Sequence, residues 1–329
     1  MATFPTPQVT ALSTKKILTP EELSAGLLAM PSLLETSDDD CEKVILYGGP
    51  GSGKTTAAGL MAEFFNILWL DGDKGLRALY HNLPQELLAR IKPIRIPDNT
   101  MTPIYMHTML KVITGRQISV CLEHGAANCP ICEKNPEAKV GIIAMNKLPR
   151  NWIVVMDSYT QFVASAVAHR FHVLNPKSVD TPEDSKFERD DWGWFKNVND
   201  KFGNYVKDLQ CNFICISHEA LIAQEDDRKK LMPVGGSDPS TRYFAKNFGT
   251  EIYCQTANGK HHFTSSTTAN AQIQTKSRSN VALEKEACPS LIHVFKPKEA
   301  KELLKGSYNE WFFGPRDKLQ PKPKEVIAI

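Results

Sequence analysis

The sequence predicts an α/β fold in which a central, mostly parallel sheet is flanked by helices. An apolar run at residues 43–47 leads through a glycine-rich turn into a helical segment at residues 56–65. Further apolar runs alternate with segments of helical spacing along the chain. Three of these runs end in polar side chains, at Asp71, Asp157 and His218. Because parallel strands direct their carboxyl ends to one edge of a sheet, we expect these polar groups to gather there.

The glycine-rich turn fits the phosphate-loop pattern G-x-x-x-x-G-K-[ST] at every fixed position. Glycines let the backbone curl so that successive N–H groups point at phosphate oxygens. The Lys54 ammonium would reach the β- and γ-phosphates of a nucleoside triphosphate, and the Thr55 hydroxyl would bind Mg²⁺. A chance glycine-rich turn, the alternative, does not explain why strand, loop, Lys-Thr pair and helix occur together. The residues predicted to hold the nucleotide are Gly48, Gly49, Pro50, Gly51, Ser52, Gly53, Lys54, Thr55 and Thr56.

Two later strands are predicted to deliver carboxylates to this site. Residues 67–70 form a short apolar run that ends in Asp71-Gly72-Asp73. Asp73 is a candidate for orienting the attacking water and Asp71 for a supporting role, although both side chains could equally cap the turn that follows. Residues 152–156 form the strongest strand pattern in the chain and end in Asp157. We predict that Asp157 helps to hold the Mg²⁺ ion.

The second half of the chain adds candidate cations and a candidate sensor. Another buried strand pattern, at residues 212–217, ends in His218. This histidine either senses the γ-phosphate or is a structural residue; its position allows both. A β-hairpin is predicted from residue 251 through an Asn-Gly turn. A further strand at residues 271–275 leads into Lys276 and Arg278, which alternation places on one face, so that both cations could reach one phosphate group.

A cysteine-rich segment interrupts the alternation of strands and helices. Its pattern is Cys121-x-x-His124-x-x-x-x-Cys129-Pro-Ile-Cys132. Two close pairs of soft or borderline ligands suit a tetrahedral Zn²⁺ ion, and three cysteines with one histidine indicate a structural metal. The alternative is free thiols, or a redox pair at Cys129 and Cys132 with His124 incidental.

Two polar stretches are predicted to be loops. The first, at residues 172–191, precedes a helical pattern that begins at Trp192. Trp192 and Trp194 could stack on nucleic-acid bases, but aromatic residues at this spacing more often belong to a core. The second stretch, at residues 220–240, contains three consecutive cations and paired glycines. It is either a phosphate-contacting loop or a solvated run of charge.

Composition limits the class of protein. The chain has 329 residues and a formal net charge of +2, so nucleic-acid binding would need a local basic patch. We expect no contact with a membrane, because no apolar run could span a bilayer and no signal peptide is recognised. Eight cysteines without such a signal favour a reducing cytoplasm. The predicted divisions are an arm at residues 1–42, a core at 43–280 with the cysteine-rich insert at 116–148, and a tail at 281–329.

The order of these motifs resembles the RecA/RadA-type ATPase core over about residues 43–280. More narrowly, it is similar to the short phage-encoded recombinases that assist single-strand annealing. The resemblance implies a RecA-like fold with ATP and Mg²⁺ as cofactors. Asp73 would match the catalytic carboxylate, where RecA proteins usually carry Glu, and His218 would match the switch position, where RecA has Gln. Lys276 and Arg278 would act in trans on the ATP of the adjacent subunit.

The resemblance also implies partners. ATP would lie at the interfaces of a homo-oligomeric ring or filament. The loops at 172–191 and 220–240 would bind single-stranded DNA, and a single-strand-binding protein would be a further partner. The host compartment would be the cytoplasm of a bacterium that carries the phage. The cysteine-rich insert has no counterpart in the RecA pattern.

The function expected from the sequence is therefore an ATP-dependent recombinase or annealing ATPase. A hexameric replicative helicase is a second hypothesis, although such helicases normally carry a larger N-terminal assembly domain. A small-molecule kinase is a third, weakened by the terminal Lys-x-Arg pair. A fourth is a matchmaker or loading protein in which the nucleotide controls assembly without being hydrolysed.

Overall fold

The computed structural model divides the chain into two compact units, Met1–Asp40 and Cys41–Ile329. It describes residues 19, 41–98, 103–127, 129, 132–135, 140–143, 148–174, 187–223, 229–237, 240–241, 244–257, 260–265, 272–277 and 290–309. All elements discussed below belong to the second unit. Among these described residues, no helix combines the length and apolar character needed to cross a membrane.

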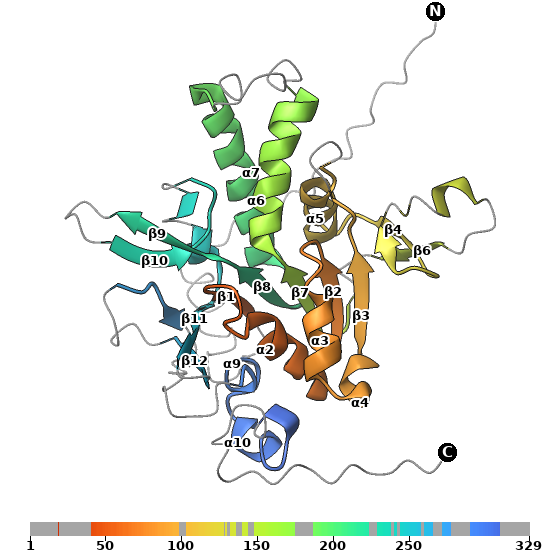
Figure 1. Cartoon of the computed structure of the whole chain (residues 1–329), viewed down its shortest axis with the longest axis vertical. Helices are drawn as coiled ribbons and strands as arrows, with labels where there is room; N and C mark the ends of the chain where they lie inside the picture. Colours follow the sequence, from red (N-terminus) through yellow and green to blue (C-terminus); the bar gives the residue numbers. More distant parts are fainter. Residues whose placement is uncertain are drawn as a thin grey trace, which may run out of the picture. The chain divides into compact units, whose positions relative to one another are not determined.

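One large sheet dominates the described part of the second unit (Figure 1). Its strand order is β12-β11-β1-β8-β7-β2-β3-β5-β4-β6, with β13 paired to β11. All neighbours from β11 to β5 are parallel, and the antiparallel pairs lie at the two ends of the sheet. The strands are β1 (Lys43–Tyr47), β2 (Asn66–Asp71), β3 (Ile91–Arg95), β4 (Ile118–Cys121), β5 (Ala126–Ala127), β6 (Val140–Ile143), β7 (Trp152–Asp157), β8 (Asn212–Ser217), β11 (Thr250–Ala257), β12 (Lys260–Thr264) and β13 (Lys276–Ser277). The predicted α/β class with a central, mostly parallel sheet is confirmed.

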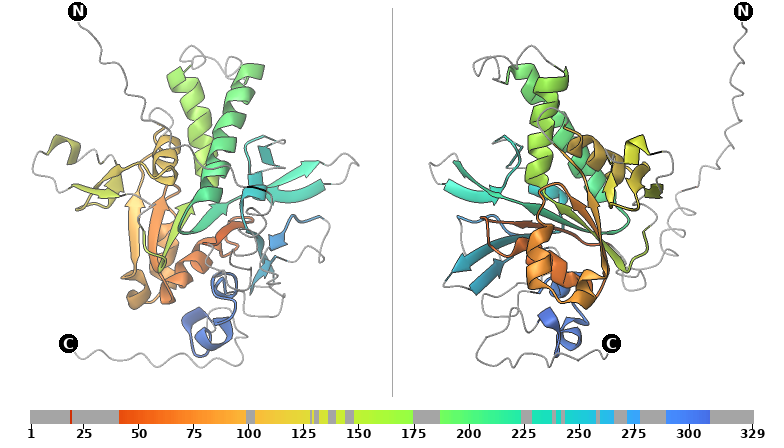
Figure 2. Two further views of the ribbon diagram at one scale, coloured as in Figure 1. Left: turned by 180° about the vertical axis from the view of Figure 1, so that it is seen from behind. Right: turned by 45° about the vertical axis from the view of Figure 1, so that its right-hand side comes forward.

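Helices cover both faces of this sheet (Figure 2). One face carries α5 (Tyr105–Ile113), α6 (Tyr159–His169) and α7 (Arg189–Asp208). The other face carries α2 (Lys54–Leu60), α3 (Leu76–Asn82), α4 (Gln85–Leu88), α9 (Ile292–Phe295) and α10 (Ala300–Leu303). Short 3₁₀ segments occupy Met61–Glu63, Cys132–Lys134 and Ala245–Asn247, and a π-helical segment, Arg170–Leu174, extends α6.

The strands are apolar because both of their faces are buried. Along β1, Val44 and Leu46 join the cluster beneath α2 and α3, whereas Ile45 joins the cluster beneath α5, α6 and α7. All three side chains are fully buried. Alternate residues of a strand point to opposite faces, so a strand between two helical layers must be apolar throughout.

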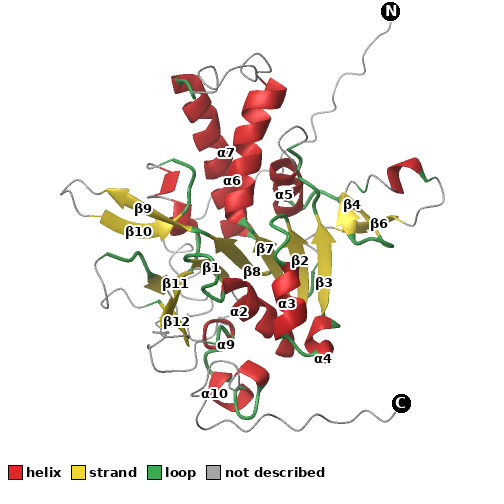
Figure 3. Cartoon of the chain, viewed as in Figure 1, coloured by secondary structure: helices red, strands yellow, loops and turns green. Residues whose placement is uncertain are grey.

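The segment at 220–240 differs from its predicted loop. It contains two antiparallel strands, β9 (Glu219–Ala223) and β10 (Lys229–Pro233), which form a separate ribbon beside the main sheet (Figure 3). Ile222 and Met232 are buried, while Leu221 is exposed. The prediction of a continuous loop was wrong at these residues, because Ile222 and Met232 follow the period of two of a strand and give the ribbon one buried face, despite the cations beside them.

Residues near the carboxyl end also differ from expectation. The predicted strand at 271–275 is reduced to an isolated bridge between Ile273 and Leu231, and the strand itself is Lys276–Ser277. The division at residue 281 stays a prediction. Within the predicted tail, however, Leu291 and Ile292 are fully buried in the cluster beneath α2. The Asn309 amide donates hydrogen bonds to Leu60 O at 3.0 Å and Glu63 Oε2 at 3.0 Å.

Candidate functional site

The glycine-rich loop follows β1 and leads into α2. Gly48, Gly51 and Gly53 have positive φ angles of 151°, 71° and 87°. A Cβ on Gly48 would overlap Cys254 O, and one on Gly53 would lie 2.9 Å from His261 Nδ1. Glycine is required at both positions, because the backbone conformation and the available space each exclude a side chain. The strand and the turn lie where the sequence predicts them, and the helix that follows, α2, begins two residues earlier and ends five residues earlier than the predicted 56–65.

Lys54 is held inside this loop. Its Nζ donates hydrogen bonds to Gly48 O at 2.7 Å, Gly49 O at 2.8 Å and Ser52 Oγ at 3.1 Å. Burial lowers the pKa of Lys54, while Cys254 and Asp157 act in the opposite direction. A partly desolvated ammonium gains more from a nearby anion than a solvated one does, because the local dielectric is low.

Asp157 lies at the end of β7, beside the end of β2. The parallel register pairs Asp71 with Asp157. Burial, followed by the charges of Asp73 and Asp71, raises the pKa of Asp157 to about 7, and Lys54 and a hydrogen bond with Thr55 oppose this rise. Asp157 Oδ2 is buried and has no hydrogen-bond partner among the described residues.

These features fit a magnesium ion. Mg²⁺ prefers oxygen ligands and is typically held by one or two protein groups together with substrate phosphates. The Thr55 hydroxyl and the Asp157 carboxylate are the two groups that would hold it, and a cation would satisfy the unpartnered Asp157 oxygen. Gly75 makes room for this carboxylate, because a Cβ there would lie 2.6 Å from Asp157 Oδ2.

Asp71 and Asp73 differ in their surroundings. Asp71 is buried, and its Oδ1 accepts a hydrogen bond from Gly75 N at 3.2 Å. The side chain of Asp73 is 43 % exposed, and its Oδ2 accepts a hydrogen bond from Ser158 Oγ at 3.4 Å. Asp71 therefore caps the turn after β2, whereas Asp73 presents a carboxylate to solvent at the sheet edge.

His218 completes this edge. Its Nε2 lies 4.0 Å from Asp73 Oδ2, and its backbone N–H donates to Thr160 Oγ1 at 2.9 Å. Burial, followed by the charge of Lys54, lowers the pKa of His218, while Asp73 and Glu219 act in the opposite direction. The structure thus brings Lys54, Asp73, Asp157 and His218 to one edge; their roles stay predictions.

Glu219 is a residue of this region that the sequence analysis did not single out. It begins β9 and folds back over the loop, so that a Cβ on Gly49 would lie 3.4 Å from Glu219 Oε1. Its Oε2 is buried without a hydrogen-bond partner among the described residues. Burial and contact with Glu219 raise the pKa of Tyr253 to about 12. The sequence signal that could have identified Glu219 is its position directly after His218, at the end of a predicted strand.

The predicted hairpin also contacts the loop. Strands β11 and β12 pair with Thr256 opposite His261. Thr256 Oγ1 donates a hydrogen bond to Gly51 O at 3.0 Å, and His261 Nδ1 lies 3.0 Å from the same hydroxyl. Thr256 and His261 thereby fix the outer turn of the loop. Neither residue belongs to a short sequence motif from which this contact could be predicted.

Lys276 lies away from the loop of its own chain. It stands opposite Glu251 on β11, which is level with Ile45 at the middle of β1, whereas the loop follows the carboxyl end of β1. Its Nζ donates hydrogen bonds to Phe248 O at 2.7 Å and Lys246 O at 3.2 Å. Arg278 lies outside the described residues.

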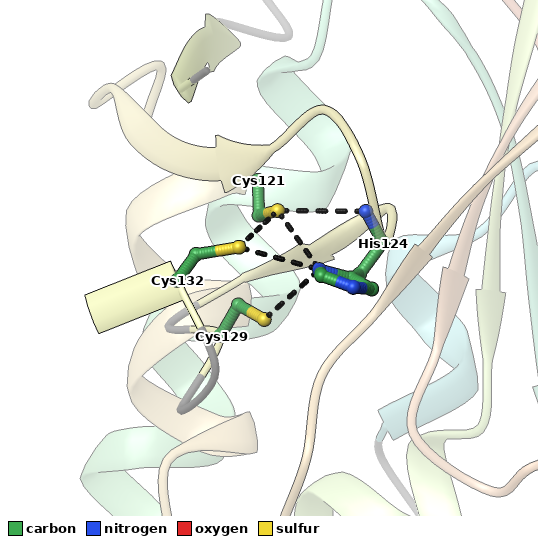
Figure 4. A group of neighbouring side chains, drawn as sticks. All are labelled: Cys121, His124, Cys129 and Cys132. Atoms are coloured by element: carbon green, nitrogen blue, oxygen red, sulfur yellow. Dashed lines mark hydrogen bonds between the residues drawn. The ribbon is translucent and has the colours of Figure 1, made fainter. Parts of the chain in front are cut away.

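A second candidate site is formed by the cysteine-rich segment (Figure 4). The ligand atoms of Cys121, His124, Cys129 and Cys132 all lie within 4.8 Å of one another. His124 Nδ1 is 3.4 Å from Cys121 Sγ, 3.7 Å from Cys129 Sγ and 3.2 Å from Cys132 Sγ. Ligands of one tetrahedral zinc ion, at about 2.0–2.3 Å from the metal, lie roughly 3.3–3.8 Å apart. The cluster could therefore hold zinc, and His124 is not incidental to it.

The segment around the cluster is fused to the main sheet. Strand β5 pairs in parallel with β3, through Arg95 and Ala126, and β4 pairs with β5 and β6. The hydrogen bond with Cys121 is the first cause that raises the pKa of Cys132 to about 12. Metal binding would thus release a proton from this thiol, since thiolates are the form that ligates zinc.

Comparisons with known proteins add little to these observations. No family model matches the chain, and no curated protein matches it. Among solved structures, that of the RadB recombinase is similar at 11 % sequence identity, covering 68 % of this chain and 79 % of that chain, with a TM-score of 0.33. A TM-score this low carries no argument.

Proposed function

We propose that this chain is a Mg²⁺-dependent ATPase that acts on single-stranded DNA in recombination as a homo-oligomer. The observation that supports it best is the convergence at one sheet edge. There the loop with Lys54 meets buried Asp157, which has an unpartnered oxygen, and the exposed pair of Asp73 and His218. A phosphate chain placed on this loop would face all four groups.

The first step is capture of the phosphates. Curled backbone around Gly51 and Gly53 directs N–H groups toward an anion. The Lys54 ammonium would exchange its contacts with loop carbonyls for the β- and γ-phosphates. Thr256 and His261 keep the loop in this conformation through the contact with Gly51.

The second step is activation of water. Mg²⁺, held through Thr55 and Asp157, would neutralise the phosphate oxygens. Asp73 would orient the attacking water, because its carboxylate is exposed at the same edge and is fixed by the Ser158 hydroxyl. His218 would report the γ-phosphate, because it lies beside Asp73 and begins the connection into β9.

The homo-oligomer is inferred from the position of Lys276, which the sequence predicts to contact a phosphate group. Lys276 is placed along β11 and away from the loop of its own chain. We therefore assign Lys276 and Arg278 to the nucleotide of a neighbouring subunit in a ring or filament. Single-stranded DNA would contact the segments at 172–191 and 220–240. The zinc cluster would be structural, and a phage annealing role with a single-strand-binding protein as partner is the narrower form of this proposal.

Steady-state ATP hydrolysis with and without single-stranded DNA tests the proposal. Lys54→Ala should lower kcat/KM by about 100-fold or more, because it removes a charge that faces the transferred phosphoryl group. Lys298→Ala, an exposed lysine in the turn between α9 and α10, is the matched control. Wild-type turnover in Lys54→Ala, or hydrolysis that DNA does not stimulate, would contradict the proposal.

A loading or matchmaker protein that binds ATP without turnover is the second candidate. One observation favours it. The residue at the predicted catalytic position is Asp73, whose side chain is shorter than that of the Glu usual in RecA proteins, and its Oδ2 lies 4.0 Å from His218 Nε2. Equilibrium binding of ATP with a rate of hydrolysis no higher than that of Lys54→Ala would support this second candidate.

A further inference from the structure

A cavity of about 640 Å³ lies between α7 and the described residues 236–237, 240, 244 and 247. Its lining includes Trp192, Lys196, Asn199, Ser237, Phe244 and Asn247. None of these residues belongs to the cysteine cluster. None belongs to the phosphate-loop edge either, the name used here for the sheet edge where Lys54, Asp73, Asp157 and His218 lie. A cavity of 300–1,000 Å³ with mostly apolar walls and a few polar groups is typical of a binding site for a small organic group.

Trp192 forms an exposed aromatic platform at one end of the cavity. Its side chain is 43 % exposed, whereas Phe195 and Phe202 of the same helix are fully buried. The indole lies perpendicular to Phe187, at 84° and 4.7 Å between ring centroids, and to Phe195, at 90° and 6.4 Å. These contacts hold the ring in one orientation. Trp194, by contrast, is partly buried and stacks on His169.

The remainder of the lining supplies hydrogen-bonding groups. Gly203 admits the amide of Asn247 to the surface of α7, because a Cβ there would overlap Asn247 Nδ2. That nitrogen donates to Phe244 O at 3.3 Å. Ser237 and Ser240 share a hydrogen bond of 3.0 Å, and each hydroxyl keeps further capacity to donate or accept.

A single cation stands among the lining residues. Lys196 Nζ lies 2.6 Å from Asp200 Oδ2, and the two side chains are 66 % and 49 % exposed. An exposed pair of this kind contributes little to stability, so Lys196 can turn to an outside anion. No other cation is among the lining residues, and none of them belongs to a glycine-rich loop like the one that precedes Lys54. They suit the single charge of a backbone phosphate better than the polyphosphate of a free nucleotide.

We propose that this cavity seats one base of bound single-stranded DNA, stacked on Trp192. The sugar and the adjoining base edges would lie along the cavity toward Ser237 and Asn247, with the phosphate beside Lys196. Trp192, Lys196 and Asn199 share one face of α7, and the first and last are about 10 Å apart along the helix axis, which accommodates a nucleotide. The inference rests on the proposed function, because it presumes DNA as the ligand.

The test measures binding of the full chain to two labelled 15-mers, oligo-dT and an abasic strand with the same phosphates. Fluorescence anisotropy is recorded with and without ATP for wild type, Trp192→Ala, Trp192→Phe and Tyr205→Ala. Tyr205 is the matched control, because it is 39 % exposed on the same helix and does not line the cavity. Trp192→Ala should weaken oligo-dT binding about tenfold, the effect of one lost stacking contact. Trp192→Phe and Tyr205→Ala should stay near wild type, and abasic binding should be equal in all four.

Three results would overturn the inference. Wild type could bind both strands equally. Trp192→Ala could weaken binding of the two strands to the same extent, or leave both unchanged. Reduced self-association of Trp192→Ala in sedimentation, with unchanged oligo-dT binding, would assign the cavity to a contact between copies. Wild-type ATP hydrolysis separates this inference from the proposed function. If wild type hydrolyses no ATP yet oligo-dT binding depends on Trp192, the stacking site in the cavity stands and the ATPase proposal falls.

Discussion

The phosphate-loop edge and the cysteine cluster are built in opposite ways. The cluster takes its four ligands from twelve consecutive residues, so one turn and two short strands suffice to form it. The phosphate-loop edge takes Lys54, Asp73, Asp157 and His218 from four separate strand ends. A local site depends on spacing, whereas a distributed site depends on the register of a whole sheet. The two regions should therefore respond differently to single substitutions.

The largest expected effect lies at the distributed site. Asp157→Asn should lower ATP hydrolysis about 1,000-fold, because a neutral amide cannot replace a carboxylate as a magnesium-holding group. The thermal midpoint should stay at or above that of wild type, since one of three neighbouring carboxylates is removed. Asp208→Asn, at the exposed end of α7, is the control. Full activity in Asp157→Asn would mean that the sheet edge is not a catalytic site.

The next effect concerns the local site. Cys129→Ser should reduce bound zinc, measured by elemental analysis, from about one ion per chain to none, and should lower the thermal midpoint by roughly 10 °C. ATP binding should change little, since the cluster lies at the β3 edge of the sheet. Cys41→Ser, outside the cluster, should keep the ion. Retained zinc in Cys129→Ser would show that this thiol is not a ligand.

A smaller effect probes the fit around Asp157, the carboxylate proposed to hold Mg²⁺. Gly75→Ala should raise the Mg²⁺ concentration required for half-maximal hydrolysis about tenfold, because the added methyl group would lie 2.6 Å from Asp157 Oδ2 and displace it. Gly193→Ala introduces the same methyl group into open space on α7 and should leave this concentration unchanged. Equal values for both variants would argue against a tightly packed ligand at this position.

The smallest expected effect is a dependence of stability on pH. The folded pKa of Asp157, about 7, lies above its ordinary value of 3.8, so its contribution is intact below pH 4 and is lost as pH rises toward 7. We subtract the thermal midpoint of Asp157→Asn from that of wild type, both without Mg²⁺. This difference should be roughly 5 °C lower at pH 8 than at pH 5. Added Mg²⁺ should remove the difference at pH 8. A difference that is flat with pH would show that Asp157 is not held in a desolvated state.

Much of the fold followed from sequence because its signals are local. The runs that became β1, β7 and β8 are apolar on both faces, and each ends within one position of the predicted end. The cluster was equally accessible, since its ligand spacing is contained in one segment. Prediction was weaker where an element depends on a distant partner, as with the ribbon of β9 and β10.

The missed residues share one property: their positions are set by contacts across long stretches of chain. Thr256 reaches Gly51, 205 residues earlier. Glu219, the first residue of β9, brings its Oε1 close to Gly49, which lies far earlier in the chain. Trp192 and Trp194 were both candidates in the sequence, but their sequence contexts are similar, and only packing distinguishes the exposed ring from the partly buried one. A single sequence without aligned relatives carries no signal for such pairings.

The contact between Asn309 and Leu60 spans 249 residues of the chain. During synthesis, at about 5–20 residues per second, α2 leaves the ribosome well before its partners exist. Helix α2 therefore keeps an uncovered apolar side until residues 290–309 have been synthesised. Nascent chains should acquire protease resistance around this helix in a late step, after the parallel strands β1, β7 and β8 have already been made.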